Sequence, residues 1–156
     1  MRPLKLLTLA ATLGAALIAA PAFAQSAPRD TATEEANRKL VVDFYDGFFN
    51  KHDVENSARV VADSYKQHNP NVPDGKAPFV SYFTDFFKKN PESRAKIVQS
   101  AADGDLVWLH IHSTDGAEDR GRAIVDIFRV EDGKIVEHWD VIQEVPETSA
   151  NDNTMF

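Results

Sequence analysis

The stretch from Gly121 to Val145 constrains the fold of this chain more than any other part of it. Two runs rich in β-branched and aromatic residues flank Glu131-Asp132-Gly133, and a turn signal between alternating runs is typical of a β-hairpin. Alternation places His138 and Asp140 on one face of the second strand, and Asp126 faces the same space if the register allows it. Ionisable side chains that share a sheet face predict an acid/base pocket, so this hairpin is the candidate site.

Residues 1–24 have the pattern of a secretory signal peptide. Arg2 and Lys5 precede an apolar run over residues 6–20, and Pro21-Ala22-Phe23-Ala24 ends in the A-x-A pattern of a cleavage site. We therefore expect cleavage after Ala24 and export to the periplasm or the medium. An uncleaved membrane anchor is the alternative, although the run is short for a membrane span. No later stretch approaches that length, so no membrane partner is expected after cleavage.

The remaining chain is acidic and contains no cysteine. The sequence has 17 Lys and Arg residues against 24 Asp and Glu residues, and two of the basic residues lie in the leader, so the mature net charge is about −9. This charge argues against nucleic acid as a partner. The absence of cysteine excludes disulfides, thiol nucleophiles and thiolate metal sites. The length after cleavage suits one domain with a single core.

Helical periodicity dominates before residue 92, and alternation dominates after it. A flexible lead-in over residues 25–32 precedes the first expected helix, for which Thr31 and Glu34 form a candidate capping box. Three helices are expected over residues 33–50, 54–63 and 76–90, and strands over residues 95–101 and 106–113 precede the hairpin. This order predicts one α+β domain over residues 33–145, with helices packed on one antiparallel sheet, and a tail over residues 146–156.

The strand over residues 106–112 carries a polar and aromatic stripe. Val107, Leu109 and Ile111 share one apolar face, and Trp108, His110 and His112 share the other. A large indole would be an unusual choice for a fully solvated face, so we predict that the three residues of the stripe line a pocket. His68, in the segment before residue 70, is a further candidate for the same pocket. A solvated outer face is the alternative for each of these histidines.

Two motifs resemble a known family. Tyr65-x-Gln67-His68-Asn69-Pro70, followed by the hairpin from Asp126-Ile127-Phe128-Arg129 to Glu137-His138-Trp139-Asp140, is similar to the SnoaL-like polyketide cyclases of the nuclear transport factor two-like superfamily. The resemblance covers about residues 34–145. It implies a cone in which three helices pack on a strongly curved antiparallel sheet and enclose an internal pocket. It also implies a homodimer, and it implies catalysis without metal or organic cofactor.

The resemblance further implies an intramolecular aldol ring closure, in which Asp140 is the general acid/base and His138 helps to hold the substrate oxygens. A carboxylate in an apolar pocket has its charged form disfavoured, which moves its pKa toward working pH. Donors such as His138, His110 or Trp108 would stabilise the enolate that proton abstraction creates. This chain departs from the cyclases at Ile124 and Asp126, which are expected to line the substrate site and which add a second acid.

Three functions remain open on the sequence alone. The first is a cofactor-free aldol cyclase or isomerase that acts on a small hydrophobic carbonyl compound through Asp140 and His138. The second is a module that binds a small hydrophobic or aromatic ligand in the same pocket without catalysis. The third is a metal site formed by His110 and His112, with His68 or His138 and a carboxylate from Asp126 or Asp140. A purely structural role is the residual possibility.

Overall fold

The computed structural model describes residues 29–156. The predicted signal peptide over residues 1–24, and residues 25–28 of the predicted lead-in, lie outside the described residues. Within the described part, no helix combines the length and the apolar character that crossing a membrane requires.

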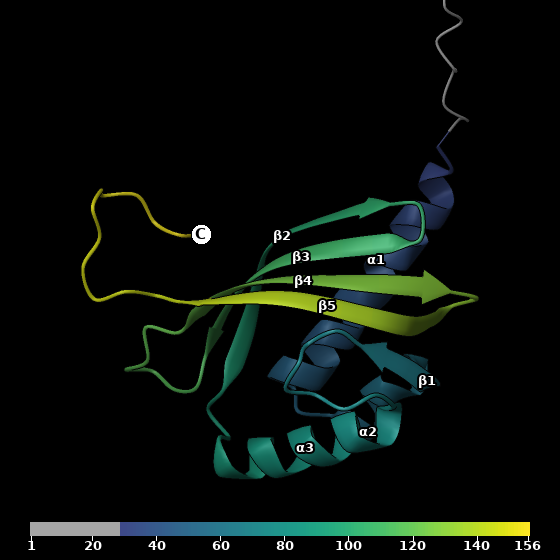
Figure 1. Cartoon of the computed structure of the whole chain (residues 1–156), viewed down its shortest axis with the longest axis horizontal. Helices are drawn as coiled ribbons and strands as arrows, with labels where there is room; N and C mark the ends of the chain where they lie inside the picture. The colour runs from purple at the N-terminus through teal and green to yellow at the C-terminus, as the bar shows by residue number, and fades with distance from the viewer. Residues whose placement is uncertain (1–28) are drawn as a thin grey trace, which may run out of the picture.

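Three helices cover one side of a five-stranded sheet (Figure 1). The helices are α1 (Thr31–Tyr45), which continues as a π-helical turn (Asp46–Asn50), α2 (Val54–Ser57), which continues as a 3-10 turn (Ala58–Val60), and α3 (Lys76–Lys89). The strands are β1 (Val61–Gln67), β2 (Arg94–Asp103), β3 (Leu106–Thr114), β4 (Arg122–Glu131) and β5 (Lys134–Glu144). Their order in the sheet is β1-β5-β4-β3-β2. The predicted α+β class and the order of helices before strands are confirmed.

The sheet is mixed rather than purely antiparallel. Strands β2 to β5 form the expected antiparallel meander, but β1 pairs with β5 in parallel. The short helix that we expected over residues 54–63 therefore ends at Val60, and the chain turns into the edge strand at Val61. The register of β1 shifts between Val61 and Lys66, which marks a bulge in this strand.

The beginning of α1 differs from the prediction. Asp30 caps the helix by accepting the Thr33 backbone N–H at 3.1 Å, so the Thr31 and Glu34 capping box is wrong. Glu34 instead pairs with Arg29 at 2.8 Å and accepts the Gly104 backbone N–H at 3.1 Å. The carboxylate that we assigned to a local cap thus ties α1 to the turn between β2 and β3.

The β4–β5 hairpin forms as the sequence predicts. Asp132 and Gly133 both have positive φ, at 48° and 70°, which is the conformation of a tight turn that matches the twist of the flanking strands. The register opposes Asp126 to Asp140 and Phe128 to His138. Residues that are opposite one another share a face of the sheet, so this register decides which side chains meet.

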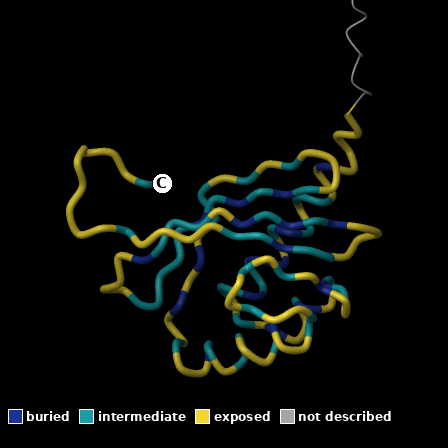
Figure 2. The backbone as a smooth tube through the Cα atoms, in the orientation of Figure 1, coloured by how far each residue is buried: buried dark blue, intermediate teal, exposed yellow. Residues whose placement is uncertain are grey.

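The core lies between the helices and the inner face of the sheet. Val107, Leu109 and Ile111 of β3 are fully buried, and they pack with the phenylalanines of α1 and α3. Figure 2 shows that the buried segments lie along the strands and the helix sides that face them, while the chain beyond β5 is mostly exposed. Helix α3 contributes to this core through Phe79 and Phe87.

Candidate active site

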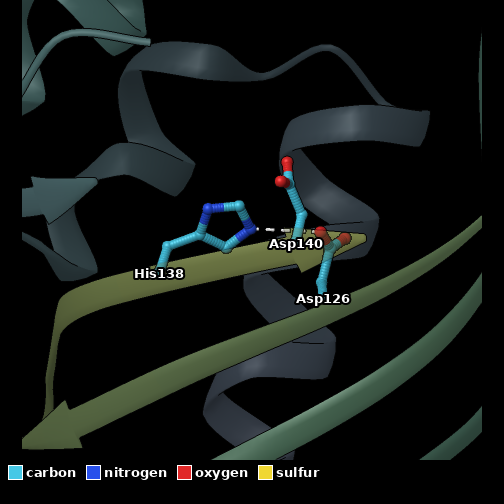
Figure 3. A group of neighbouring side chains, drawn as sticks. All are labelled: Asp126, His138 and Asp140. Carbon is cyan, nitrogen blue, oxygen red and sulfur yellow. Dashed lines mark hydrogen bonds and ion pairs between the residues drawn. The ribbon is translucent and has the colours of Figure 1, made fainter. Parts of the chain in front are cut away.

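Three of the predicted site residues meet on the inner face of β4 and β5. Asp126 lies directly opposite Asp140, and His138 is the preceding inward residue of β5. Figure 3 shows the three side chains gathered above the two strands, with an interaction between His138 and Asp126. Atoms that each residue offers as a ligand lie within 4.8 Å of one another. The register that the sequence left open therefore brings Asp126 to the pair.

Hydrogen bonds determine where the protons of His138 lie. Its Nδ1 is 2.8 Å from Oε1 of Gln67, and the same Oε1 accepts the backbone N–H of Asn69 at 3.0 Å. A backbone N–H only donates, so the Gln67 atom is the amide oxygen, and His138 must donate to it from Nδ1. The tautomer of His138 is thereby assigned by the network around it.

The contact between His138 and Asp126 therefore requires one further proton. Nε2 of His138 lies 3.0 Å from Oδ1 of Asp126. With the Nδ1 position already protonated, two lone pairs would face each other unless a proton lies between these atoms, as an imidazolium or as a carboxylic acid. Tyr45 donates its hydroxyl to Oδ2 of Asp126 at 2.7 Å, so both oxygens of this buried carboxyl group have partners. His138 and Asp126 thus share one proton.

Asp140 has a different environment from Asp126. Nδ2 of Asn69 donates to Oδ2 of Asp140 at 2.7 Å, and the Asn69 amide is oriented by the Asn71 backbone N–H, which donates to its Oδ1 at 2.9 Å. Oδ1 of Asp140 has no hydrogen-bond partner among residues 29–156. Asp140 is also partly exposed, whereas Asp126 and His138 are 6% and 8% exposed. Asp140 is therefore the carboxylate with an oxygen free to accept a proton.

Two tyrosines beneath these carboxylates remain protonated over a wide pH range. Burial first, and the neighbouring Asp126 carboxylate second, raise the pKa of Tyr45 well above its usual value. Burial and then Asp126 and Asp140 raise the pKa of Tyr65 in the same direction. Both hydroxyls therefore act as neutral groups at the site.

A cavity of about 330 Å³ begins beside these residues. Tyr45 and Asn69, which hold the two carboxylates, line it, and so do Ile124 and Ile142, the next inward residues of β4 and β5. The opposite wall comes from α3 and is aromatic, with Phe83 and other rings of this helix. The cavity is thus mostly apolar, and the hydrogen-bond partners of the two carboxylates lie at one end of it. Ile124 lies where the sequence predicted it.

The polar stripe of β3 lies on the opposite side of the sheet. Trp108, His110 and His112 are opposite Ile127, Val125 and Ala123 of β4, all of which point away from the helices. None of the three lines the cavity, so our prediction that they do is wrong. His110 and His112 stack instead on Phe156, with ring centroids 5.7 Å and 4.1 Å apart, which docks the end of the tail on the outer face.

His68 also points away from the cavity. Its ring stacks on Trp139 with centroids 4.6 Å apart, and its Nε2 lies 2.7 Å from Oε1 of Glu137. The reason is the strand conformation of this segment, which continues past the last residue of β1. Gln67 and Asn69 point inward, and the residue between them must point outward.

One group of side chains has the composition of a metal site. Asp126, His138 and Asp140 together offer one imidazole nitrogen and two carboxylate oxygens. The Nδ1 hydrogen bond to Gln67 is the kind of support that a metal-bound imidazole receives in proteins. The metal site that we considered around His110 and His112 is wrong, because the sheet separates these rings from both carboxylates.

Sequence reasoning missed three residues of the network, namely Tyr45, Gln67 and Asn69. Alternation through Tyr65-x-Gln67-x-Asn69 was the available signal for the last two, since it places them on one side once this segment is taken as a strand. Tyr45 lies within the helix expected over residues 33–50, and helical spacing alone gives it no polar role. Its hydroxyl had no assigned partner, and a buried hydroxyl needs one.

Comparison with known proteins agrees with this geometry. The model of the SnoaL-like domain family matches residues 41–138. The chain belongs to the SnoaL-like family. Among curated proteins, none matches the sequence significantly. The family resemblance that we inferred from the two motifs is therefore confirmed.

Several solved structures share the fold. A candidate ketosteroid isomerase from Kribbella flavida superposes with a TM-score of 0.62 at 19% identity, over 76% of this chain and 85% of that chain. A SnoaL-like protein of unknown function from Burkholderia thailandensis gives 0.61 at 16% identity, over 70% and 96%. A candidate polyketide cyclase from Bacillus cereus gives 0.58 at 22% identity, over 69% and 74%. At these identities the likeness shows the fold alone.

Proposed function

We propose that this SnoaL-like protein is a cofactor-independent acid/base enzyme that removes a proton from carbon next to a carbonyl group, as an aldol cyclase or an isomerase does. One observation carries the proposal. Oδ1 of Asp140 is the one carboxylate oxygen of the network without a partner among the described residues, and Asn69, which holds this carboxylate, lines an apolar cavity. The printed descriptions of two fold neighbours, ketosteroid isomerase and polyketide cyclase, support the same class of chemistry.

Asp140 is the proposed general base. Asn69 fixes its carboxylate through Oδ2 and leaves Oδ1 for the substrate proton. The second hydrogen of the Asn69 Nδ2 is available for the substrate oxygen, since the amide itself lines the cavity. Base and donor then belong to one rigid unit, which keeps the enolate oxygen close to a preorganised hydrogen bond.

His138 has an indirect role in this proposal. Both of its ring nitrogens are engaged with protein groups, Gln67 and Asp126, so the ring is a positioning residue rather than a direct donor to substrate. Its shared proton keeps the cluster from carrying two uncompensated carboxylates, which lie directly opposite each other on β4 and β5. That compensation lowers the repulsion between the two carboxyl groups.

Hydrogen–deuterium exchange tests the proposal without knowledge of the natural substrate. An acetylnaphthalene in D₂O would lose the proton signal of its methyl group, measured by NMR, faster with the enzyme than without it. Asp140→Asn is expected to reduce the catalysed rate by a factor of about 100 or more, which is typical for loss of a general base. The matched control is Asp43→Asn on α1, whose exposed carboxylate pairs with Lys39. It should keep the full rate.

Other outcomes would contradict the proposal. Full exchange activity in Asp140→Asn would eliminate this residue as the base. Tight binding of the ketone without any exchange would instead support the binding-module function. Activity could also be lost on dialysis against a chelator and recovered on adding zinc. That result would mean that a metal ion held by Asp126, His138 and Asp140, rather than the shared proton, compensates the two carboxylates.

We also propose that the enzyme acts outside the cytoplasm. The basic start, the apolar run and the Ala22-Phe23-Ala24 site of the leader support this. Intact-mass measurement of the protein from the exported fraction should give a chain that begins at Gln25. A full-length chain retained in the membrane would contradict it.

A further inference from the structure

Two arginines line the end of the cavity away from Asp140. Arg122, at the beginning of β4, and Arg94, at the beginning of β2, both line it. Arg122 belongs to the same inward row of the sheet as Ala95 and Ser113, which also line the cavity. The cavity therefore has one end at Tyr45 and Asn69, which donate hydrogen bonds to the carboxylates, and a basic end at this row, where Asp115 also lines it beside the two arginines.

Strand β4 gives the spacing between the two ends. Asp126, Ile124 and Arg122 are successive inward residues of this strand. A strand advances about 3.3 Å per residue, so the Cα atoms of Asp126 and Arg122 are about 13 Å apart. After allowance for the two side chains, this span fits a rigid body of about two fused rings with a functional group at each end.

The middle of the cavity accepts only an apolar body. Ile124 and Ile142 form its floor, and they belong to a row of four isoleucines that crosses β2 to β5 with Ile97 and Ile111. Phe83 and Phe86 of α3 form the facing wall. A ligand that spans the cavity therefore presents aliphatic or aromatic carbon along its length and polar groups only at its ends.

The charges at the basic end are incompletely compensated. Arg122 donates from Nη2 to Oδ1 of Asp115 at 2.7 Å, and its Nη1 and Nε have no partner among residues 29–156. Arg94 donates from Nη1 to the carbonyl oxygens of Pro91 and Ser93, and it pairs with no carboxylate in that part of the chain. Donors remain for an anionic group, and a carboxylate matches the fork of a guanidinium.

We infer that the substrate is an apolar carbonyl compound of about two rings that carries a carboxylate at the end remote from its reacting carbon, bound by Arg122 and Arg94. The inference rests on the proposed function, because the carbonyl end is placed at Asp140. Glu144 is the β5 neighbour of Arg122, but it is exposed and does not line the cavity.

Calorimetric titration with two matched probes tests this inference. The first is an acetylnaphthoate with its acetyl and carboxylate groups at opposite ends of the ring system, and the second is the corresponding neutral amide. The wild-type protein is expected to bind the acid about fivefold to tenfold more tightly than the amide, with the difference reduced by salt. Arg122→Gln and Arg94→Gln should each weaken binding of the acid and leave the affinity for the amide unchanged.

Two further variants test whether the charge around Arg122 controls the affinity for the acid. Asp115→Asn removes the carboxylate beside Arg122 and should strengthen binding of the acid. Arg59→Gln, on the 3-10 turn after α2 and away from the cavity lining, should change nothing. Equal affinities for acid and amide in the wild type, failure of both probes to bind, or equal losses in Arg59→Gln and Arg122→Gln would each overturn the inference.

The two readouts separate this inference from the proposed function. A charge-dependent preference for the acid without any methyl exchange would keep the binding inference and refute the acid/base function. Exchange on both probes without preference for the acid would keep the function and refute the substrate class.

Discussion

The two faces of strands β3 to β5 carry similar side chains in very different surroundings. On the inner face, His138 lies against Asp126 with every ring nitrogen bonded, and both residues are buried. On the outer face, His110 and His112 are partly exposed, and the tail residue Phe156 stacks on them. Both faces resemble a pocket lining in the sequence, but only the inner one contributes to the cavity.

The difference shows which residues decide the face of a strand that turns toward the core. On β3 the purely aliphatic set, including Leu109, takes the core, and the stripe with Trp108 takes the outside, although the indole is the larger apolar group. Leu109 lies opposite Asp126, so the carboxylates share the buried face with it. Val125 and Val141 on the outer face are exposed.

Adjacent substitutions on β3 should show the largest contrast between the faces. Leu109→Ala removes a fully buried side chain and is expected to lower the free energy of unfolding by about 2–5 kcal/mol. His110→Ala, its neighbour on the outer face, should change it by no more than about 0.5 kcal/mol. Urea titration of both variants measures the difference. Similar losses in the two would mean that the outer stripe is covered in solution.

The buried tyrosines should make the free energy of unfolding depend on pH, and this effect is smaller than the one on β3. Tyr65 and Tyr45 keep their protons in the folded protein at a pH where unfolded tyrosines lose them, because folding raises the pKa of each. The unfolded state then binds fewer protons, so stability falls as pH rises above about 10. The slope is about 1.4 kcal/mol per pH unit for each tyrosine.

Tyr65→Phe should remove one tyrosine's share of this slope, measured as unfolding free energy between neutral and alkaline pH. Tyr82→Phe is the matched control, because Tyr82 is 62% exposed and its hydroxyl is solvated before and after unfolding. An unchanged slope in Tyr65→Phe would contradict the burial argument.

Much of the fold could be predicted from local patterns. The β4–β5 hairpin, its turn at Asp132 and Gly133, and helix α3 follow from alternation, turn chemistry and helical spacing. The triad of Asp126, His138 and Asp140 follows from the hairpin alone once the register is fixed. These features depend on residues close together in the chain, which is why sequence reasoning reached them.

The rest depends on contacts between distant segments. β1 pairs in parallel with β5, so Gln67 meets His138 across 71 positions of the chain. No local pattern predicts such a pairing. This is why we wrongly expected His68 to line the pocket. The faces of β3 were also ambiguous in isolation, since alternation states that two faces exist and not which one the helices cover.

The bulge in β1 gives this edge strand an influence beyond its length. It sets the phase of the segment that follows, so that Gln67 and Asn69 reach His138 and Asp140 while His68 is turned away. Side chains alternate with a period of two, so a slip of one residue after the bulge would exchange these positions. A single insertion or deletion between Val61 and Lys66 would then remove the partners of His138 and Asp140, and it would also disturb the core at Tyr65.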